Sequence, residues 1–159
     1  MLSVMGKLTD EIKQTKPFAT LEDEAFVSVL RTAEAFLWRE AEFLKPHEVT
    51  LAQYNVLRIL RGAEPDGLIC REIGERMITR DPDVTKLLDR LETRGLVSRE
   101  RQEKDRRIIV ARVTAEGLGL LEKLDGPVLG LTAELLGHLG QQKLRTLIRL
   151  LEEAREKAG

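Results

Sequence analysis

Cysteine, histidine and aromatic residues are scarce in this chain. The first two shortages each argue against a kind of site, and the third bears on the fold class. The single cysteine, Cys70, cannot form a disulfide within the chain, so we expect a reducing compartment, the cytoplasm. The two histidines, His47 and His138, have no cysteine or carboxylate partner at ligand spacing, so we expect no metal site. With 4% aromatic and 33% charged residues, a composition rich in leucine and alanine favours helices.

The chain also lacks long apolar runs and catalytic motifs. No stretch approaches 18 consecutive apolar residues, so we expect no membrane span, and residues 1–13 lack the apolar core of a secretion signal. No nucleophile and base pair, phosphate-binding glycine loop or carboxylate pair stands out. We therefore predict that the chain is not an enzyme and uses no cofactor.

Charge is unevenly distributed along the 159 residues. The formal net charge of −1 on its own argues against a nucleic-acid-binding protein. Basic side chains nevertheless outnumber acidic ones in residues 71–112, whereas acidic ones are in excess in the rest of the chain. If the chain binds an anionic partner, the middle of the chain is therefore the segment that we expect to contact it.

Two helices with clear boundaries are predicted in the first part of the chain. Thr20, followed by Asp23, reads as a helix cap, and apolar residues then recur at helical spacing up to Leu44. The helix should end at Lys45-Pro46, because proline disfavours helical backbone in the residue before it. A second capping box, Thr50-Leu-Ala-Gln53, starts a helix that ends at Gly62.

Two shorter helices follow, and together with the second helix they suggest a helix-turn-helix. Residues 68–78 form an amphipathic helix in this interpretation, and residues 79–82 form a turn. Asp81 is expected to cap the next helix and Pro82 to occupy its first position. That helix should end at Gly95, in a left-handed conformation.

After Gly95 the hydrophobic period changes from helix to strand. Residues 96–99 and 108–113 read as two strands joined by a charged tip that contains the sequence EKDRR. A helix-turn-helix followed by a hairpin is a winged helix, whose third helix can enter the major groove of DNA. Helices resume at Thr114, with interruptions at Gly126-Pro127, where proline should kink or break the helix, and at Gly137 to Gly140.

The helix after Pro82 has two distinct faces. Val84, Leu87, Leu88 and Leu91 should point inward. The outward residues include the candidate DNA-binding side chains Asp83, Thr85, Lys86 and Arg90, to which we add Arg94. Thr85 and Lys86 lie near the end that usually meets bases, and Arg90 and Arg94 are better placed for phosphates. The alternative is an ordinary solvated helix face.

Several motifs together resemble the MarR (multiple antibiotic resistance regulator) family. They are Leu51-Ala-Gln-Tyr-Asn-Val-Leu57, Ile73-Gly-Glu-Arg-Met77, Val84-Thr-Lys-Leu-Leu-Asp-Arg-Leu-Glu-Thr-Arg-Gly-Leu-Val-Ser-Arg99, Asp105-Arg-Arg107 and Val113-Thr-Ala-Glu-Gly117. The resemblance covers residues 20–157. It implies a mainly helical winged helix-turn-helix fold and a homodimeric repressor that binds double-stranded DNA at a palindromic operator. It further implies release of the DNA by a small ligand such as a phenolic compound or an aromatic acid.

The resemblance also implies roles for the wing and for the helices around it. Lys104, Asp105, Arg106 and Arg107 would form the DNA-contacting tip, with Asp105 orienting an arginine side chain. Within a single domain over residues 1–159, residues 50–114 would form the DNA-binding lobe, and residues 8–45 and 115–158 the dimerisation lobe. The leucine-rich stripes in the last two segments must pack against each other or against a partner chain.

Three alternatives stay open on the sequence alone. Trp38, His47 and Tyr54 are candidates for an effector pocket, although core packing is the favoured use of Trp38 and Tyr54. Cys70 lies beside Arg71 and near a helix start, both of which lower a thiol pKa, so a redox-sensing regulator is a second possibility. A winged-helix protein-interaction module without DNA binding is the third.

Overall fold

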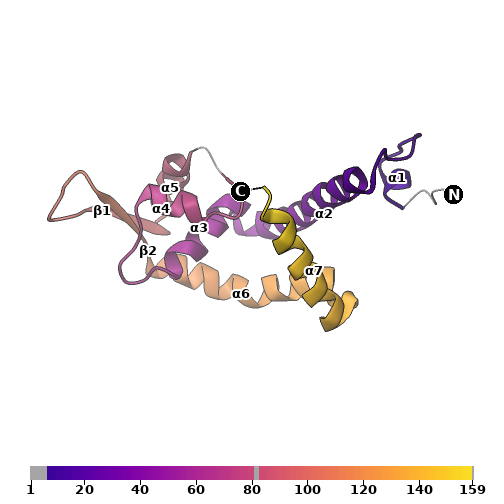
Figure 1. The fold of residues 1–159 in the computed structure, drawn as a ribbon. Coiled ribbons are helices and arrows are strands. Elements are labelled where there is room, and N and C mark those ends of the chain that lie inside the picture. Colours follow the sequence, from indigo (N-terminus) through magenta and orange to yellow (C-terminus); the bar gives the residue numbers. More distant parts are fainter. Residues whose placement is uncertain (1–6, 81–82, 159) are drawn as a thin grey trace. The chain divides into compact units, whose positions relative to one another are not determined.

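The computed structural model describes residues 7–80 and 83–158. The chain divides into two compact units, Met1–Glu42 and Phe43–Gly159. The elements, in chain order, are α1 (Lys7–Glu11), α2 (Leu21–Leu44), the 3₁₀ turn η1 (Lys45–His47), α3 (Leu51–Arg61), α4 (Cys70–Arg76), α5 (Val84–Thr93), β1 (Val97–Arg101), β2 (Ile109–Val113), α6 (Ala115–Leu136), η2 (Gly137–Leu139) and α7 (Gly140–Arg155) (Figure 1). The chain is mainly helical, as predicted.

The first unit contains α1 and most of α2. The Thr20 side chain accepts a hydrogen bond from the backbone N–H of Asp23 at 3.2 Å, which confirms the predicted cap. Acidic residues in the first turn, Glu22 to Glu24, further favour this start because the helix dipole places partial positive charge there. The apolar stripe of α2 is largely exposed, and Phe26 retains 64% of its accessible surface.

The helix-turn-helix of the second unit is formed by α3, α4 and α5 (Figure 1). The capping box of α3 is present in both directions between Thr50 and Gln53. The prediction of a helix over residues 68–78 was too long, since α4 spans only Cys70–Arg76. Leu68 instead forms an antiparallel bridge with Ala111 of β2, through backbone hydrogen bonds of 3.0 and 2.8 Å.

The C-terminal end of α5 sets the direction of the hairpin that follows it. Gly95 has a φ of +71°, so the predicted left-handed position is confirmed. The N–H groups of Gly95 and Leu96 donate to the carbonyls of Glu92 and Leu91 at 2.9 and 3.0 Å, the paired bonds of a Schellman motif. Strand β1 therefore leaves α5 through a hydrogen-bonded turn rather than a free linker.

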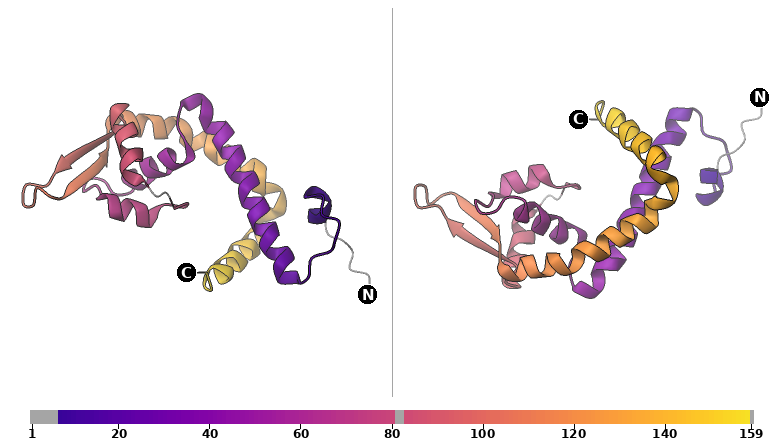
Figure 2. Two further views of the ribbon diagram at one scale, coloured as in Figure 1. Left: turned by 90° about the horizontal axis from the view of Figure 1, so that it is seen from above. Right: turned by 90° about the horizontal axis from the view of Figure 1, so that it is seen from below.

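The hairpin of β1 and β2 is the wing. The strands are antiparallel, with Val97 opposite Val113 at the base and Arg101 opposite Ile109 toward the tip. Both views of Figure 2 show the hairpin extending beyond α3, α4 and α5. Burial declines along β1 from base to tip, so the base belongs to the core and the tip to the solvent.

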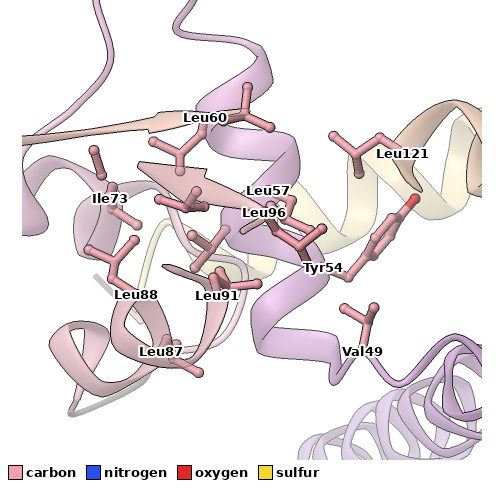
Figure 3. Close-up of a cluster of buried hydrophobic side chains, with 14 of the residues drawn as sticks. Val49, Tyr54, Leu57, Leu60, Ile73, Leu87, Leu88, Leu91, Leu96 and Leu121 are labelled. Carbon is pink, nitrogen blue, oxygen red and sulfur yellow. The ribbon is translucent and has the colours of Figure 1, made fainter. Parts of the chain in front are cut away.

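The core of the second unit forms around α3, which contacts α4, α5, α6 and β2. Leu57 and Leu60 of α3 are buried together with Leu88 and Leu91 of α5 (Figure 3). Burial of each leucine contributes about 2 kcal/mol. Because these side chains fix one face of α5 against α3, the opposite face of α5 must point to solvent.

Helix α6 differs from the prediction at Gly126-Pro127. A kink or break was expected there, and the break is absent, because Ala115–Leu136 is one continuous α-helix with Pro127 inside it. Proline removes the hydrogen bond that its own N–H would make, and its ring crowds the carbonyl four residues earlier, but neither effect has to end the helix. Leu121 and Leu124 before the proline are buried, and so is Leu131 after it. The buried face of the helix therefore continues on both sides of Pro127. The predicted interruption at Gly137 to Gly140 is present as η2.

No helix in the described part of the chain is both long and apolar enough to span a membrane.

Candidate nucleic-acid interface

The N-terminal end of α5 is organised by Asp83 and Lys86. The Asp83 carboxylate accepts a hydrogen bond from the backbone N–H of Lys86 at 3.0 Å, and a second oxygen lies 2.8 Å from Lys86 Nζ. The hydrogen bond between the two side chains lowers the pKa of Asp83 and raises the pKa of Lys86. Asp83 thus caps the helix and holds the lysine.

This arrangement corrects the predicted start of the helix. Asp81 was expected as the cap and Pro82 as the first helical residue, but the cap is Asp83 and the first helical residue is Val84. Asp81 and Pro82 themselves lie outside the described residues. The reason for the shift is local: Asp83 is three residues before Lys86, the spacing at which a cap side chain meets the free N–H.

The outer face of α5 presents Thr85, Lys86 and Arg90, all exposed. In the described parts of the chain, the Arg90 guanidinium has no ion-pair or hydrogen-bond partner. The Thr93 hydroxyl donates to the backbone carbonyl of Asp89 at 2.8 Å and so is turned back onto the helix. Arg90 is therefore the cation of this face that is available to an external anion.

Arg94 makes hydrogen bonds within the protein, and its DNA contact stays a prediction. Its guanidinium donates to the backbone carbonyl of Glu48, and more weakly to that of His47 at 3.5 Å. His47 is the last residue of η1, and Glu48 follows it in the turn before α3. Arg94 therefore links the end of α5 to the residues just before α3, while the residue itself remains exposed.

The wing tip is held by its backbone. The Asp105 carboxylate accepts the backbone N–H of Arg107 at 3.0 Å, and the N–H of Ile108 donates to the Asp105 carbonyl at 3.0 Å. The carboxylate was expected to orient an arginine side chain, but it stabilises the turn itself. An aspartate this close to the turn reaches the N–H two residues on more easily than a mobile guanidinium.

The cations of the tip are consequently exposed and unpaired. Lys104, Arg106 and Arg107 are all exposed, and their side chains form no ion pair with any residue that the structure describes. Arg101 of β1 donates to the Arg106 carbonyl at 3.2 Å, which supports the turn from the strand side. The tip thus carries three positive charges on a shaped loop, an arrangement suited to phosphate.

Arg99 is the most strongly bonded arginine of the wing, and the sequence alone did not predict a role for it. Its guanidinium binds Asp89 at 2.6 Å and Glu92 at 2.5 Å, and its Nε donates to Glu92 at 2.9 Å. The hydrogen bond with Glu92 is the main cause that raises the pKa of Arg99. Two acidic residues one helical turn apart, followed by an arginine in the adjoining strand, were the available signal.

The three effector candidates fall in different units. Trp38 lies in the first unit, exposed, at a surface hollow of about 600 Å³ that also involves Glu11, Arg31 and Arg39. His47 and Tyr54 belong to the second unit. Tyr54 is only 3% exposed and lies under the Arg58 guanidinium, while His47 contacts the Phe43 ring. The effector pocket stays a prediction.

Cys70 is a half-buried free thiol at the first position of α4. Across residues 7–80 and 83–158, no three histidine, cysteine, aspartate or glutamate side chains gather as a metal ion would require.

Comparison with known proteins identifies the family. A family model described as the MarR family matches residues 47–108. The HTH-type transcriptional regulator TtmR of Methylorubrum extorquens (strain PA1) is 37% identical over 106 residues, which cover 67% of this chain and 53% of that protein. The organic hydroperoxide resistance transcriptional regulator of Bacillus subtilis (strain 168) is 33% identical over 112 residues, covering 69% and 74%.

A solved structure agrees with the sequence relatives. The crystal structure of a MarR transcription factor from Planctomyces limnophilus is 39% identical, has a TM-score of 0.67, and is matched over 85% of this chain and 98% of that one. The chain belongs to the MarR family. This MarR-family protein is therefore a transcriptional regulator of the winged-helix type, a class that consists of DNA-binding proteins rather than enzymes.

Proposed function

We propose that this MarR-family protein is a homodimeric repressor that binds a palindromic operator through α5 and the wing and releases it when a small ligand binds. The observation that carries the DNA contact is the set of unpaired cations on these two elements. Arg90 on α5 and Arg106 and Arg107 at the wing tip are exposed. Thr85 and Lys86 at the start of α5 would meet the bases, and Arg90 and the tip would meet phosphates.

Exposed apolar side chains support the homodimer. Phe26 and Leu30 of α2 are 64% and 54% exposed, and Ile148 and Leu150 of α7 are 56% and 50% exposed. Exposed apolar side chains such as these are stabilised when a second chain covers them. We assign the dimerisation lobe to residues 8–45 and 115–158 and the DNA-binding lobe to residues 50–114. A two-fold axis would place two α5 helices about 34 Å apart, one turn of DNA.

Selection of bound duplexes from a random pool tests this proposal. We expect enrichment of a sequence with two-fold symmetry whose half-sites are about one helical turn apart. Binding should also weaken steeply as salt rises, because cations of the protein displace counterions from the phosphates. Lack of duplex binding at low salt, or binding that ignores salt, would instead favour a protein-interaction module.

Release by a small ligand is the remaining part of the proposal. Its support is the family resemblance. The name of the Bacillus subtilis relative, which refers to organic hydroperoxide resistance in that protein, bears instead on the redox alternative. We propose Trp38, His47 and Tyr54 as effector residues and an aromatic acid or phenolic compound as the ligand. Titration of the DNA complex with benzoate and with phenol should release the DNA. The redox alternative predicts release by peroxide that is lost in a Cys70→Ser variant.

A further inference from the structure

One arginine side chain, Arg99, forms ion pairs between the recognition helix and the wing. Arg99 projects from β1 and bonds to Asp89 and Glu92 of α5 through three contacts of 2.5 to 2.9 Å. Its side chain is only 22% exposed, although both partners remain in contact with solvent, at 53% and 39%. The planar guanidinium has its donors in a fixed geometry, so the three contacts restrict the orientation of β1 against α5.

The same contacts change the charge of the DNA-facing element. Asp89 and Glu92 are two carboxylates on a helix that must approach phosphates, and each would be repelled by them. Arg99 shares one positive charge between the two. Without it, α5 and the base of the wing would carry two uncompensated negative charges between Arg90 and the tip.

Simultaneous contact by both elements requires a fixed angle between them. Arg90 is on α5, whereas Arg106 and Arg107 are at the far end of the hairpin (Figure 2). A small rotation at the base of a hairpin produces a large displacement at its tip. The Arg99 contacts lie near the base, where they oppose such a rotation.

We propose that Arg99 is a positioning residue for DNA binding, which couples the wing to the recognition helix so that both engage the duplex together. This inference rests on the proposed DNA-binding function. It differs from a direct DNA contact by Arg99 and from a purely electrostatic effect. Its specific consequence is that the wing-tip arginines contribute to affinity only while Arg99 is bound to Asp89 and Glu92.

A double-mutant cycle measures that consequence. Affinity is measured for the duplex selected on the wild-type protein, of about 30 base pairs so that both half-sites are included. The Arg106→Ala/Arg107→Ala change is made in the wild-type protein, in Arg99→Gln and in Asp89→Asn/Glu92→Gln. We expect a loss of roughly tenfold in the wild type and of at most about twofold in the other two backgrounds, because coupled residues are not additive.

The Asp89→Asn/Glu92→Gln background separates positioning from charge. It keeps Arg99 and removes two negative charges, so a charge effect alone predicts tighter binding with the full contribution of the tip. Positioning predicts that the tip contribution is lost even though the protein is more positive. This background also replaces Arg99→Gln if that variant does not fold, which circular dichroism will show.

Arg112→Gln is the matched control. Arg112 is in the same hairpin; it pairs with Glu100 of β1 at 3.3 Å and donates to the Pro65 carbonyl at 3.0 Å, and neither partner belongs to α5. The tip arginines should keep their roughly tenfold contribution in this background. Equal tip contributions in all backgrounds, or no contribution in the wild type, overturn the inference. Failure of the wild-type protein to bind any duplex overturns the proposed function itself.

Discussion

The Arg61 guanidinium and the Asp125 carboxylate are joined by two hydrogen bonds, Nη1 to Oδ2 at 2.8 Å and Nη2 to Oδ1 at 3.1 Å. Arg61 is the last residue of α3, and Asp125 lies in the middle of α6, directly before Gly126-Pro127. The ion pair therefore attaches the first half of α6 to the helix-turn-helix at the point where α6 loses a backbone hydrogen bond.

The contribution of this pair to stability should depend on pH. The hydrogen bond from Arg61 lowers the pKa of Asp125 below its ordinary value of 3.8. The stabilisation is thus fully present above about pH 4 and is lost as the pH falls through the lower pKa of the folded protein. Asp125→Asn should cost about 1 kcal/mol at pH 7, a modest value because solvent screens a half-exposed pair.

Urea unfolding at several pH values measures this effect. The difference between wild type and Asp125→Asn should shrink as the pH is lowered below about 4. Glu122→Gln, on the exposed side of the same helix, is the control and should show a smaller difference. A difference that is constant with pH would mean that the carboxylate charge is not the source of the stability.

Gly117 should be intolerant of substitution although it lies in a helix. A Cβ at this position would approach the Leu96 carbonyl oxygen to 2.3 Å and a methyl of Val113 to 2.7 Å. Gly117→Ala should therefore destabilise the protein by about 1–3 kcal/mol through overpacking. At Gly119 a Cβ meets no atom within 4 Å. Gly119→Ala should be neutral or stabilising by up to about 1 kcal/mol in thermal unfolding; equal effects at both positions would refute the close approach.

The two tip arginines should act on all DNA sequences alike. Arg106→Ala and Arg107→Ala should each weaken binding to selected and unselected duplexes by the same factor, because phosphate contacts carry no sequence information. Each should reduce the slope of log affinity against log salt by about 1. Arg155→Ala, at the end of α7, serves as the charge control. An altered sequence preference would assign the affected arginine to a base contact.

Asp83 should limit binding to unselected DNA. Asp83→Asn retains an oxygen that can cap Lys86 N–H, but it removes the carboxylate that binds the Lys86 ammonium. The released lysine and the lost negative charge should raise affinity for unselected duplexes several-fold. Asp66→Asn, an exposed carboxylate in the loop before α4, removes the same charge elsewhere. If both variants bind alike, only net charge matters.

Elements with a strong hydrophobic period could be predicted from the sequence. The caps at Thr20 and Thr50 and the left-handed Gly95 lay where local patterns put them. These features depend on residues within one turn of each other. The continuous course of α6 through Pro127 was missed because it depends on packing along the helix, whereas proline considered alone predicts a kink or a break.

The partners of the charged side chains could not be predicted in the same way. Arg94 binds carbonyls of residues 47 and 48, and Arg99 binds acids on a different element. The Arg94 bonds form only when distant segments meet, and the Arg99 bonds form only when the turn at Gly95 brings β1 beside α5. The sequence predicted the residue types at the interface. Only the fold shows which of these cations have no ion-pair partner among the described residues.

The bridge between Leu68 and Ala111 has a consequence for the order of folding. The β1–β2 hairpin is a local structure that can close within microseconds, whereas the bridge joins the wing to a segment before α4 and must wait for the chain between them to collapse. Amide hydrogens at the bridge should exchange with solvent only when the helix-turn-helix opens as a unit, while those of the tip should exchange freely. The amide hydrogens at the base of the wing should thus be protected as strongly as those of the core, whereas those at the tip should be as unprotected as in a loop.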